Sequence, residues 1–261
     1  MRGRPTALIV HSRMRTTFSG MRKAVIAFLV LSLAACGSKQ AATTGPAATG
    51  GVVTGKIEAA NFVTEVDNPW FPLPAGGKWV YRGEKDGIPS HEVATVSGAK
   101  KAIQGVECTI VHDVLYQRGH IAERTDDFYA QDKDGNVWYF GEVTAELNAK
   151  GEVTSREGSW QSGRNGASAG VFMTASPKVG ESYRQEYLKG HAEDHFQVVS
   201  LGETVNVPGA SSAKALLTKE WTPLEPNVLD HKFYVRGIGT VLEQTVRGGS
   251  ERNALVSFTR G

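Results

Sequence analysis

The 261-residue sequence contains only two cysteines, Cys36 and Cys108. Its apolar runs are shorter than the roughly 20 residues that a membrane-spanning helix needs. No window keeps the 3.6-residue apolar period of a helix beyond about two turns. These absences exclude a multi-span membrane protein and predict few helices. The composition, 40% hydrophobic and 21% charged, is that of a globular protein that can bury a real core.

Acidic residues are absent from the first 35 positions, which hold six basic side chains. Removing these six from the 29 basic residues of the whole chain leaves 23 against 27 acidic residues, a net charge of −4. The positive net charge therefore belongs to the N-terminal segment. It gives no support to nucleic-acid binding.

The N-terminal segment has the features of a bacterial lipoprotein signal peptide. The cationic stretch that begins at Met21 is followed by the apolar run 24–33 and by Leu33-Ala34-Ala35-Cys36. This last tetrapeptide resembles a lipobox, in which the cysteine becomes the lipidated N-terminus. We therefore expect residues 1–20 to be a start-site extension, residues 21–35 a signal peptide and Cys36 the lipidated (diacylglyceryl and palmitate-type) residue. An uncleaved anchor or a soluble secreted protein is the alternative.

Residues 36–56 follow as the lipidated cysteine and a tether rich in Gly, Ala and Thr. Such a segment cannot bury enough apolar surface to fold. Three acyl chains exceed the two signals that stable anchoring needs. We expect a cell-envelope protein held on a membrane through Cys36. That membrane is the outer membrane in a two-membrane host and otherwise the outer face of the cell membrane.

From residue 57 onward, short β-branched and aromatic runs alternate with glycine turns. The dipeptides 86–87, 118–119, 134–135, 150–151 and 248–249 are hairpin signals between consecutive runs. We expect residues 57–261 to be one all-β domain, an antiparallel curved sheet that forms a barrel, half-barrel or sandwich. The expected strands are 78–83, 91–96, 106–116, 121–131, 137–142, 153–155, 182–187, 194–200, 204–207, 213–222, 231–235, 240–246 and 255–259.

Two local features refine this expectation. The proline-stiffened apolar run 70–74 is predicted to be a plug across one end of the barrel. Cys108 alternates in step with Val106 and Ile110, which is typical of a buried structural thiol. With Cys36 acylated, no intramolecular disulfide is possible.

Four sequence stretches resemble those of a family of uncharacterised bacterial secreted lipoproteins. They are NPWFPL (68–73), WVY (79–81), AQDKDGNVWYFGE (130–142) and KEWTPLEP (219–226). The resemblance covers nearly all of residues 58–261. Because that family has no established activity, the resemblance bears only on location and on the extent of the domain.

Several short motifs for catalysis or metal binding occur in the sequence without the structural context that they require. The sequence 166–170 matches the G-x-S-x-G elbow around Ser168, but it lacks the buried strand and following helix that the elbow requires. The stretch 132–136 lacks the glycine and glutamate of a calcium loop, so we interpret it as a hairpin. His191 and His195 would lie about 13 Å apart on a strand, too far to share a metal ion. No cofactor, metal site or catalytic residue is predicted.

The candidate site lies on two neighbouring strands. His112 falls on the apolar face of its strand, as a hydrogen-bonded core histidine does. The odd positions of 121–131 alternate apolar and acidic groups, among them Glu123 and Asp127. They form either a solvated outer face or the polar lining of a concave β-cup. Lys219 is expected to pair with Asp127 or Glu123. The predicted lining is Asp127, Tyr129, Trp138 and Lys219.

Three functional hypotheses remain. The first is a non-enzymatic domain that binds a small molecule or an envelope protein inside the cup. The second is an envelope hydrolase that uses Ser168 or the carboxylates of Glu123 and Asp127, although these two carboxylates are about 13 Å apart along one strand. The third is a structural protein of the cell envelope.

Overall fold

The computed structural model describes residues 57–261. The predicted start-site extension, signal peptide and tether, with Cys36, lie outside the described residues. The helical content of the described part is one 3-10 turn, Ala59–Asn61. No helix within residues 57–261 is long and apolar enough to cross a membrane.

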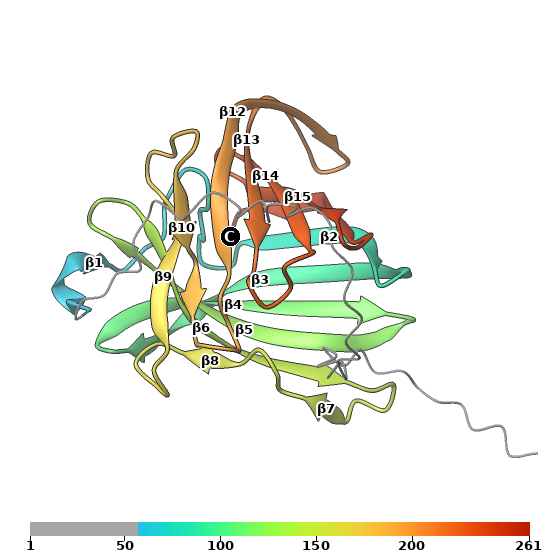
Figure 1. The fold of residues 1–261 in the computed structure, drawn as a ribbon, viewed down its shortest axis with the longest axis horizontal. Helices are drawn as coiled ribbons and strands as arrows, with labels where there is room; N and C mark the ends of the chain where they lie inside the picture. Colours follow the sequence, from blue (N-terminus) through green and yellow to red (C-terminus); the bar gives the residue numbers. More distant parts are fainter. Residues whose placement is uncertain (1–56) are drawn as a thin grey trace, which may run out of the picture. The chain divides into compact units, whose positions relative to one another are not determined.

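The domain is built almost entirely of antiparallel strands, which confirms the predicted all-β fold (Figure 1). Every strand pair in residues 57–261 is antiparallel. The strands are β1 (Phe62–Val63), β2 (Lys78–Lys85), β3 (Ile88–Ile103), β4 (Val106–Gln117), β5 (His120–Asp132), β6 (Val137–Leu147), β7 (Val153–Ser155), β8 (Trp160–Gln161), β9 (Ser168–Met173), β10 (Ser182–Arg184), β11 (Glu186–Tyr187), β12 (His195–Val207), β13 (Ala210–Trp221), β14 (Leu229–Val235), β15 (Gly239–Arg247) and β16 (Arg252–Thr259).

The sheet curls into a nearly closed barrel. Its strands follow the order β10-β12-β13-β14-β15-β16-β2-β3-β4-β5-β6-β9-β11. The two ends of this path are consecutive in the chain, because β10 pairs with β12 while β11 pairs with β9. The short segment 182–187 therefore joins the two edges of the sheet.

The predicted hairpin turns are confirmed at all five positions, since each lies between two consecutive strands that the structure contains. Asp86 and Gly87 have φ values of 58° and 71°, and Arg118 and Gly119 have 51° and 81°. Two successive positive φ values are the signature of the type I′ turn, whose twist matches that of the flanking strands.

Several strand predictions need correction. The predicted strand 182–187 is divided into β10 and β11. No strand is expected between 156 and 181, but the structure has β9 there, which pairs with β6 and β11. Gly170 allows this close approach: a Cβ there would lie 2.2 Å from the carbonyl oxygen of Arg184. The separate strands 194–200 and 204–207 are one strand, β12, which bulges between Val198 and Val205.

The core has two parts. The larger cluster includes Trp70, Leu73 and Phe71, so the predicted plug segment does pack against the core. A smaller cluster lies around Phe128 and Cys108. Cys108 is fully buried, and burial raises its thiol pKa to about 12, as expected of a structural thiol.

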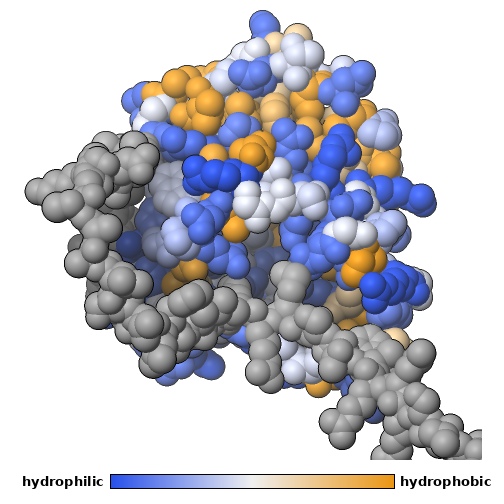
Figure 2. Space-filling model, turned by 45° about the vertical axis from the view of Figure 1, so that its right-hand side comes forward, coloured by the Kyte–Doolittle hydropathy of each residue, from blue (hydrophilic) through white to orange (hydrophobic). Residues whose placement is uncertain are grey.

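The outer surface mixes polar and apolar residues. On the face seen in Figure 2, hydrophobic residues gather towards the top, the level at which the β12–β13 hairpin lies in Figure 1. Val199 and Leu201 of β12 are among the exposed large hydrophobic residues.

Candidate functional site

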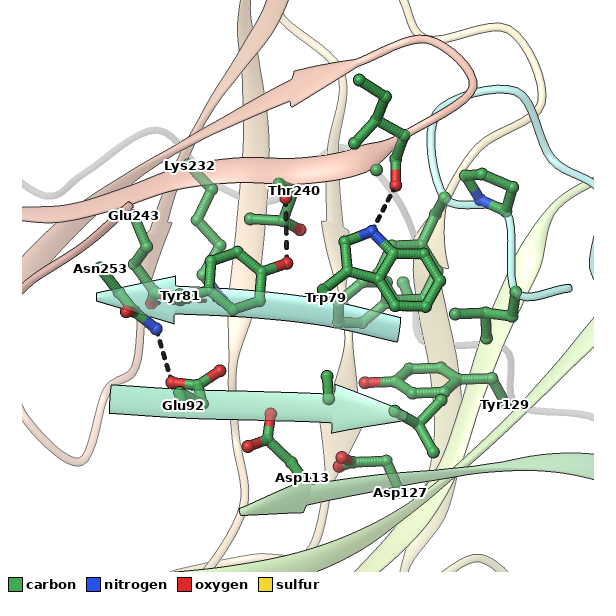
Figure 3. A pocket seen from close by; sticks show the side chains of 18 residues that line it. Trp79, Tyr81, Glu92, Asp113, Asp127, Tyr129, Lys232, Thr240, Glu243 and Asn253 are labelled. Atoms are coloured by element: carbon green, nitrogen blue, oxygen red, sulfur yellow. Dashed lines mark hydrogen bonds and ion pairs between the residues drawn. The ribbon is translucent and has the colours of Figure 1, made fainter. Parts of the chain in front are cut away.

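The curved sheet holds a cavity with two adjoining parts. The first, which we call the inner part, is lined mainly by aromatic and aliphatic side chains. This part has a volume of about 140 Å³. Its wall is contributed by the plug segment at Phe71, by β2 at Trp79, by β5 at Tyr129 and by β9 at Phe172. Phe71 contacts Tyr129 and Phe172 with ring centroids 5.2 and 4.5 Å apart. Figure 3 shows the hydroxyl of Tyr129 pointing into this space.

The outer part of the cavity, about 280 Å³, is lined mainly by charged and polar groups. Its carboxyl groups come from strands that are neighbours in the sheet: Glu84 (β2), Glu92 (β3), Asp113 (β4), Glu123 and Asp127 (β5), Glu142 (β6), Glu243 (β15) and Glu251. The inner and outer parts share Glu92, Asp113, Asp127, Glu243 and Asn253.

Strand register explains why these carboxyl groups meet. Asp127 pairs directly with Glu142, and it pairs with Val111, which is two residues from Asp113. Asp113 in turn pairs with Ala94, two residues from Glu92. Because side chains two residues apart point to the same face, the four carboxyl groups run across β3, β4, β5 and β6 inside the barrel.

Lysines balance only part of this charge. Lys232 lies 2.9 Å from Glu220 and 3.4 Å from Glu243. Lys85 lies 3.5 Å from Glu123. Within residues 57–261, no salt bridge reaches Glu92, Asp113, Asp127 or Glu142.

One phenol connects two of the unbalanced carboxyl groups. The hydroxyl of Tyr139 lies 2.5 Å from Oδ1 of Asp127 and 3.1 Å from Oε2 of Glu142. A phenol carries one proton and can donate only one hydrogen bond at a time. Both contacts are satisfied together only when one of the two carboxyl groups also keeps a proton.

The carboxyl pKa values agree with this geometry. Burial, partly offset by the hydrogen bond from Tyr139, raises the pKa of Asp127 to about 7. Burial and the neighbouring Asp127 raise the pKa of Glu142 to about 8. Burial also raises the pKa of Asp113, with the charge of Glu92 adding to the effect, and it raises the pKa of Glu92 itself.

Asn253 supplies an unused acceptor at the same place. Its amide nitrogen donates to Oε2 of Glu92 at 2.5 Å (Figure 3). Its side-chain oxygen is buried and has no hydrogen-bond partner within the described part of the chain. A buried acceptor without a donor is costly, so this oxygen favours a donor from a bound molecule.

The structure brings together two of the four predicted lining residues. Asp127 and Tyr129 both line the inner cavity. Trp138 lies elsewhere: it packs against Phe62 and donates from Nε1 to Asp132 at 2.8 Å. Lys219 also lies elsewhere, with its ammonium group 6.0 Å from the ring of Trp221.

The expected partner of Lys219 is therefore wrong. Lys219 is at an odd position of β13, whereas Thr218 and Glu220, on the opposite face, are the residues buried beside Lys232. Lys85 of β2 is the residue that pairs with Glu123. The alternation of side chains along this part of β13 places Lys219 on the face opposite to Thr218 and Glu220.

The core interpretation of His112 is also wrong. Its side chain is about half exposed, 47%, and Nδ1 lies 2.6 Å from Asp126. The odd positions of β4, with Val111 and Asp113, are the ones that line the cavity. The even face instead covers the smaller cluster at Val106 and Cys108.

Ser168 does not lie in a nucleophile elbow. It opens β9, pairs with Tyr187 and is followed by a strand rather than a helix. No hydrogen bond between this serine and a histidine occurs in residues 57–261.

The sequence reasoning missed Glu92, Asp113, Glu142, Lys232 and Glu243. The alternation of polar and apolar residues along each strand shows which residues share a face. It does not show that these five side chains meet in one cavity, because that depends on the register between strands. For metals, no group of three or more His, Cys, Asp or Glu side chains in the described part of the chain is placed to hold an ion.

Comparison with known proteins finds similarity to solved structures. No family model and no curated protein matches the chain. Two solved structures do. One is a protein from Bacteroides fragilis that is proposed to be exported and has a YmcC-like fold; it is 16% identical, covers 73% of this chain and 98% of its own, and has a TM-score of 0.44. The other is a proposed lipoprotein from Parabacteroides distasonis, 11% identical, covering 72% and 97%, with a TM-score of 0.39. At these values neither structure bears on the function of the cavity.

Proposed function

We propose that residues 57–261 form a binding domain that holds a small molecule inside the barrel, without catalysis. The observation that carries this proposal is the two-part cavity, apolar at its inner end and rich in carboxyl groups at its outer end. A concave, largely preformed site with an apolar wall and a few converging polar groups is the usual anatomy of ligand binding. The cavity volume of about 140 Å³ is similar to engineered cavities that accept one benzene ring.

We further propose that this domain is displayed on a membrane of the cell envelope. The support comes from the sequence: the signal-peptide pattern of residues 21–35, the lipobox cysteine at Cys36 and the tether that follows it. The Gly-, Ala- and Thr-rich composition of residues 36–56 predicts a linker between the anchor and the barrel.

Native mass spectrometry of the full-length chain, purified from its own host, tests the binding function. We expect an additional non-protein mass on the folded chain. Ala94→Leu, which fills the inner cavity, should remove that mass. Ala102→Leu is the matched control, because Ala102 lies exposed on the same strand. A chain that is empty, and is only made more stable by Ala94→Leu, would favour the structural envelope protein instead.

A specific observation also keeps a carboxylate hydrolase as the second candidate. Asp127 and Glu142 contact one hydroxyl at 2.5 and 3.1 Å, so the two contacting oxygens are at most about 5.6 Å apart. Retaining glycosidases use carboxyl groups about 5 Å apart. The structure thus supplies the second carboxylate on another strand that Glu123 could not supply. Against catalysis, the hydroxyl of Tyr139 occupies the space between the two groups, where a scissile bond would have to lie.

Glycoside and ester hydrolysis assays on the full chain separate the two candidates. The binding function predicts no turnover above that of Asp127→Asn and no labelling by a fluorophosphonate. Turnover that Asp127→Asn and Glu142→Gln both abolish would establish the hydrolase, and labelling that is lost in Ser168→Ala would establish an esterase.

A further inference from the structure

The polar end of the cavity holds more negative charge than the protein balances. Glu92, Asp113, Asp127 and Glu142 cross four neighbouring strands without an ion pair among the described residues. Their carboxyl groups can remain there in two ways: each can keep a proton, or a cation from outside can take the place of protons.

The buried side-chain oxygen of Asn253 is a second observation that bears on the chemistry of a ligand. It lies beside Glu92, lines both parts of the cavity and lacks a donor within residues 57–261. A ligand that brings N–H or O–H groups would satisfy it. An ammonium group has up to three such donors and a positive charge, so it suits both the amide oxygen and the carboxylates.

The apolar end of the cavity limits the rest of the ligand. Trp79, Tyr129 and Phe172 form its wall, and Tyr129 stacks on Tyr139 with ring centroids 4.8 Å apart. The volume suits one aromatic ring or an alkyl group of that size. An inorganic cation would leave this wall without a contact.

We propose that the cavity binds an organic cation, a primary or secondary amine attached to one aromatic ring or an apolar group of that size. This proposal rests on the binding function proposed above. The ammonium group lies among Glu92, Asp113 and Asp127, beside Asn253. The apolar group lies against Trp79, Tyr129 and Phe172.

Binding of such a cation releases protons. The carboxyl groups around Asp127 come from several strands: Glu92 on β3, Asp113 on β4, Glu123 and Asp126 on β5, Glu142 on β6 and Glu243 on β15. The phenols of Tyr129 and Tyr139 and the ammonium groups of Lys85 and Lys232 lie in the same surroundings. Arg252, Glu84 and Glu251 also line the polar part of the cavity. With the pKa of Asp127 at about 7, affinity should rise up to about tenfold per pH unit and per proton released below pH 7.

Isothermal titration calorimetry of the full-length chain with four probes tests the proposal. The probes are 2-phenylethylamine, the neutral 2-phenylethanol, the anionic 3-phenylpropanoate and calcium chloride. We expect the amine to bind about tenfold or more tightly than the alcohol, with weaker binding of the other two probes. Repeating the titration in two buffers of different protonation enthalpy should reveal proton release with the amine alone.

Isosteric variants locate the interaction. Asp113→Asn and Asp127→Asn should each weaken the amine about tenfold and leave the alcohol unchanged. Asp134→Asn is the matched control, since Asp134 is exposed in the turn between β5 and β6 and does not line the cavity. The four probes are compared on the unaltered chain, so this comparison does not depend on whether any variant folds.

Every other outcome contradicts the proposal that the ligand is an organic cation. Equal or tighter binding of the alcohol would show that the ligand needs no positive charge, while the proposed binding function would stand. Calcium binding without amine binding would assign the carboxyl groups to an inorganic ion. If no probe binds, the amine proposal fails, and the native mass measurement decides separately whether the cavity binds any ligand.

Discussion

Tyr139 and Asp127 share a hydrogen bond of 2.5 Å inside the barrel, formed between strands that are adjacent in the sheet. The same hydroxyl also contacts Glu142. The hydrogen bonds among these three side chains therefore depend on whether the two carboxyl groups are protonated. This arrangement links the protonation of the cavity to the stability of the barrel.

The first prediction is that stability decreases as pH rises from 6.5 to 8.5. Asp127 and Glu142 have folded pKa values of about 7 and about 8, against about 4 in an unfolded chain. The folded state therefore holds protons that the unfolded state has lost, and this contribution disappears as pH rises through 7 and 8. The lowered pKa values of His195 and His231 act in the opposite direction, but below about pH 6.5.

Thermal unfolding followed by circular dichroism measures this effect. We expect Tm to fall by about 3 °C or more over that range, since each kcal/mol corresponds to about 2 to 4 °C in a domain of this size. The double variant Asp127→Asn/Glu142→Gln should flatten the dependence, whereas Asp134→Asn, at an exposed position of the turn between β5 and β6, should leave it unchanged. A Tm that is constant or rises over the range would show that these groups are ionised in the folded state.

The second prediction concerns Lys232. Its ammonium group lies between Glu220 and Glu243, and its side chain is 21% exposed. Lys232→Met leaves the buried carboxyl group of Glu220 and the partly exposed one of Glu243 without a cation, which should lower the free energy of unfolding by about 3 kcal/mol.

Urea denaturation gives the difference directly. The control is Lys178→Met, because Lys178 is 77% exposed and 3.8 Å from Glu181; it should cost less than about 0.5 kcal/mol. Adding Glu220→Gln to Lys232→Met should recover part of the loss. Equal effects of the two lysine variants would mean that the interior pair is screened like a surface pair.

The architecture could be predicted from the sequence because its signals are local. Each hairpin turn is a dipeptide, such as Asp86-Gly87, and each strand shows its own alternation. The same local information identified the face of β5 that carries Asp127 and Tyr129. It left open whether that face meets solvent or the cavity.

The remainder of the site depends on pairings that no local pattern contains. Asp113 and Glu142 become neighbours of Asp127 only through the register of β4 and β6, and β6 bulges beside Tyr139. Gly141, with φ 139°, allows that irregularity, since a Cβ there would lie 2.4 Å from the carbonyl oxygen of Trp160. Alternation along β4 favoured the wrong face for His112 because both faces of that strand are partly covered.

The third prediction concerns anchoring. Cys36→Ser should block lipidation and signal cleavage, because the thiol is the atom that receives the diacylglyceryl group in a lipobox protein. A larger precursor should accumulate, and metabolic labelling with a clickable fatty acid should be lost. Labelling that persists in the variant would exclude Cys36 as the lipidated residue.

The last prediction tests how the barrel closes. The segment 182–187 joins both edges of the sheet, and it approaches β9 so closely that a Cβ on Gly170 would lie 2.2 Å from the backbone oxygen of Arg184. Gly170→Ala must push this segment away, which should cost about 2 kcal/mol or more in urea denaturation. Gly202→Ala is the matched control, because a Cβ on Gly202 meets nothing within 4 Å. Amide hydrogen exchange should then be faster at β9, β10 and β11 in Gly170→Ala while β3 and β4 stay protected. Uniform loss of protection would show that the closure and the rest of the barrel unfold as one unit.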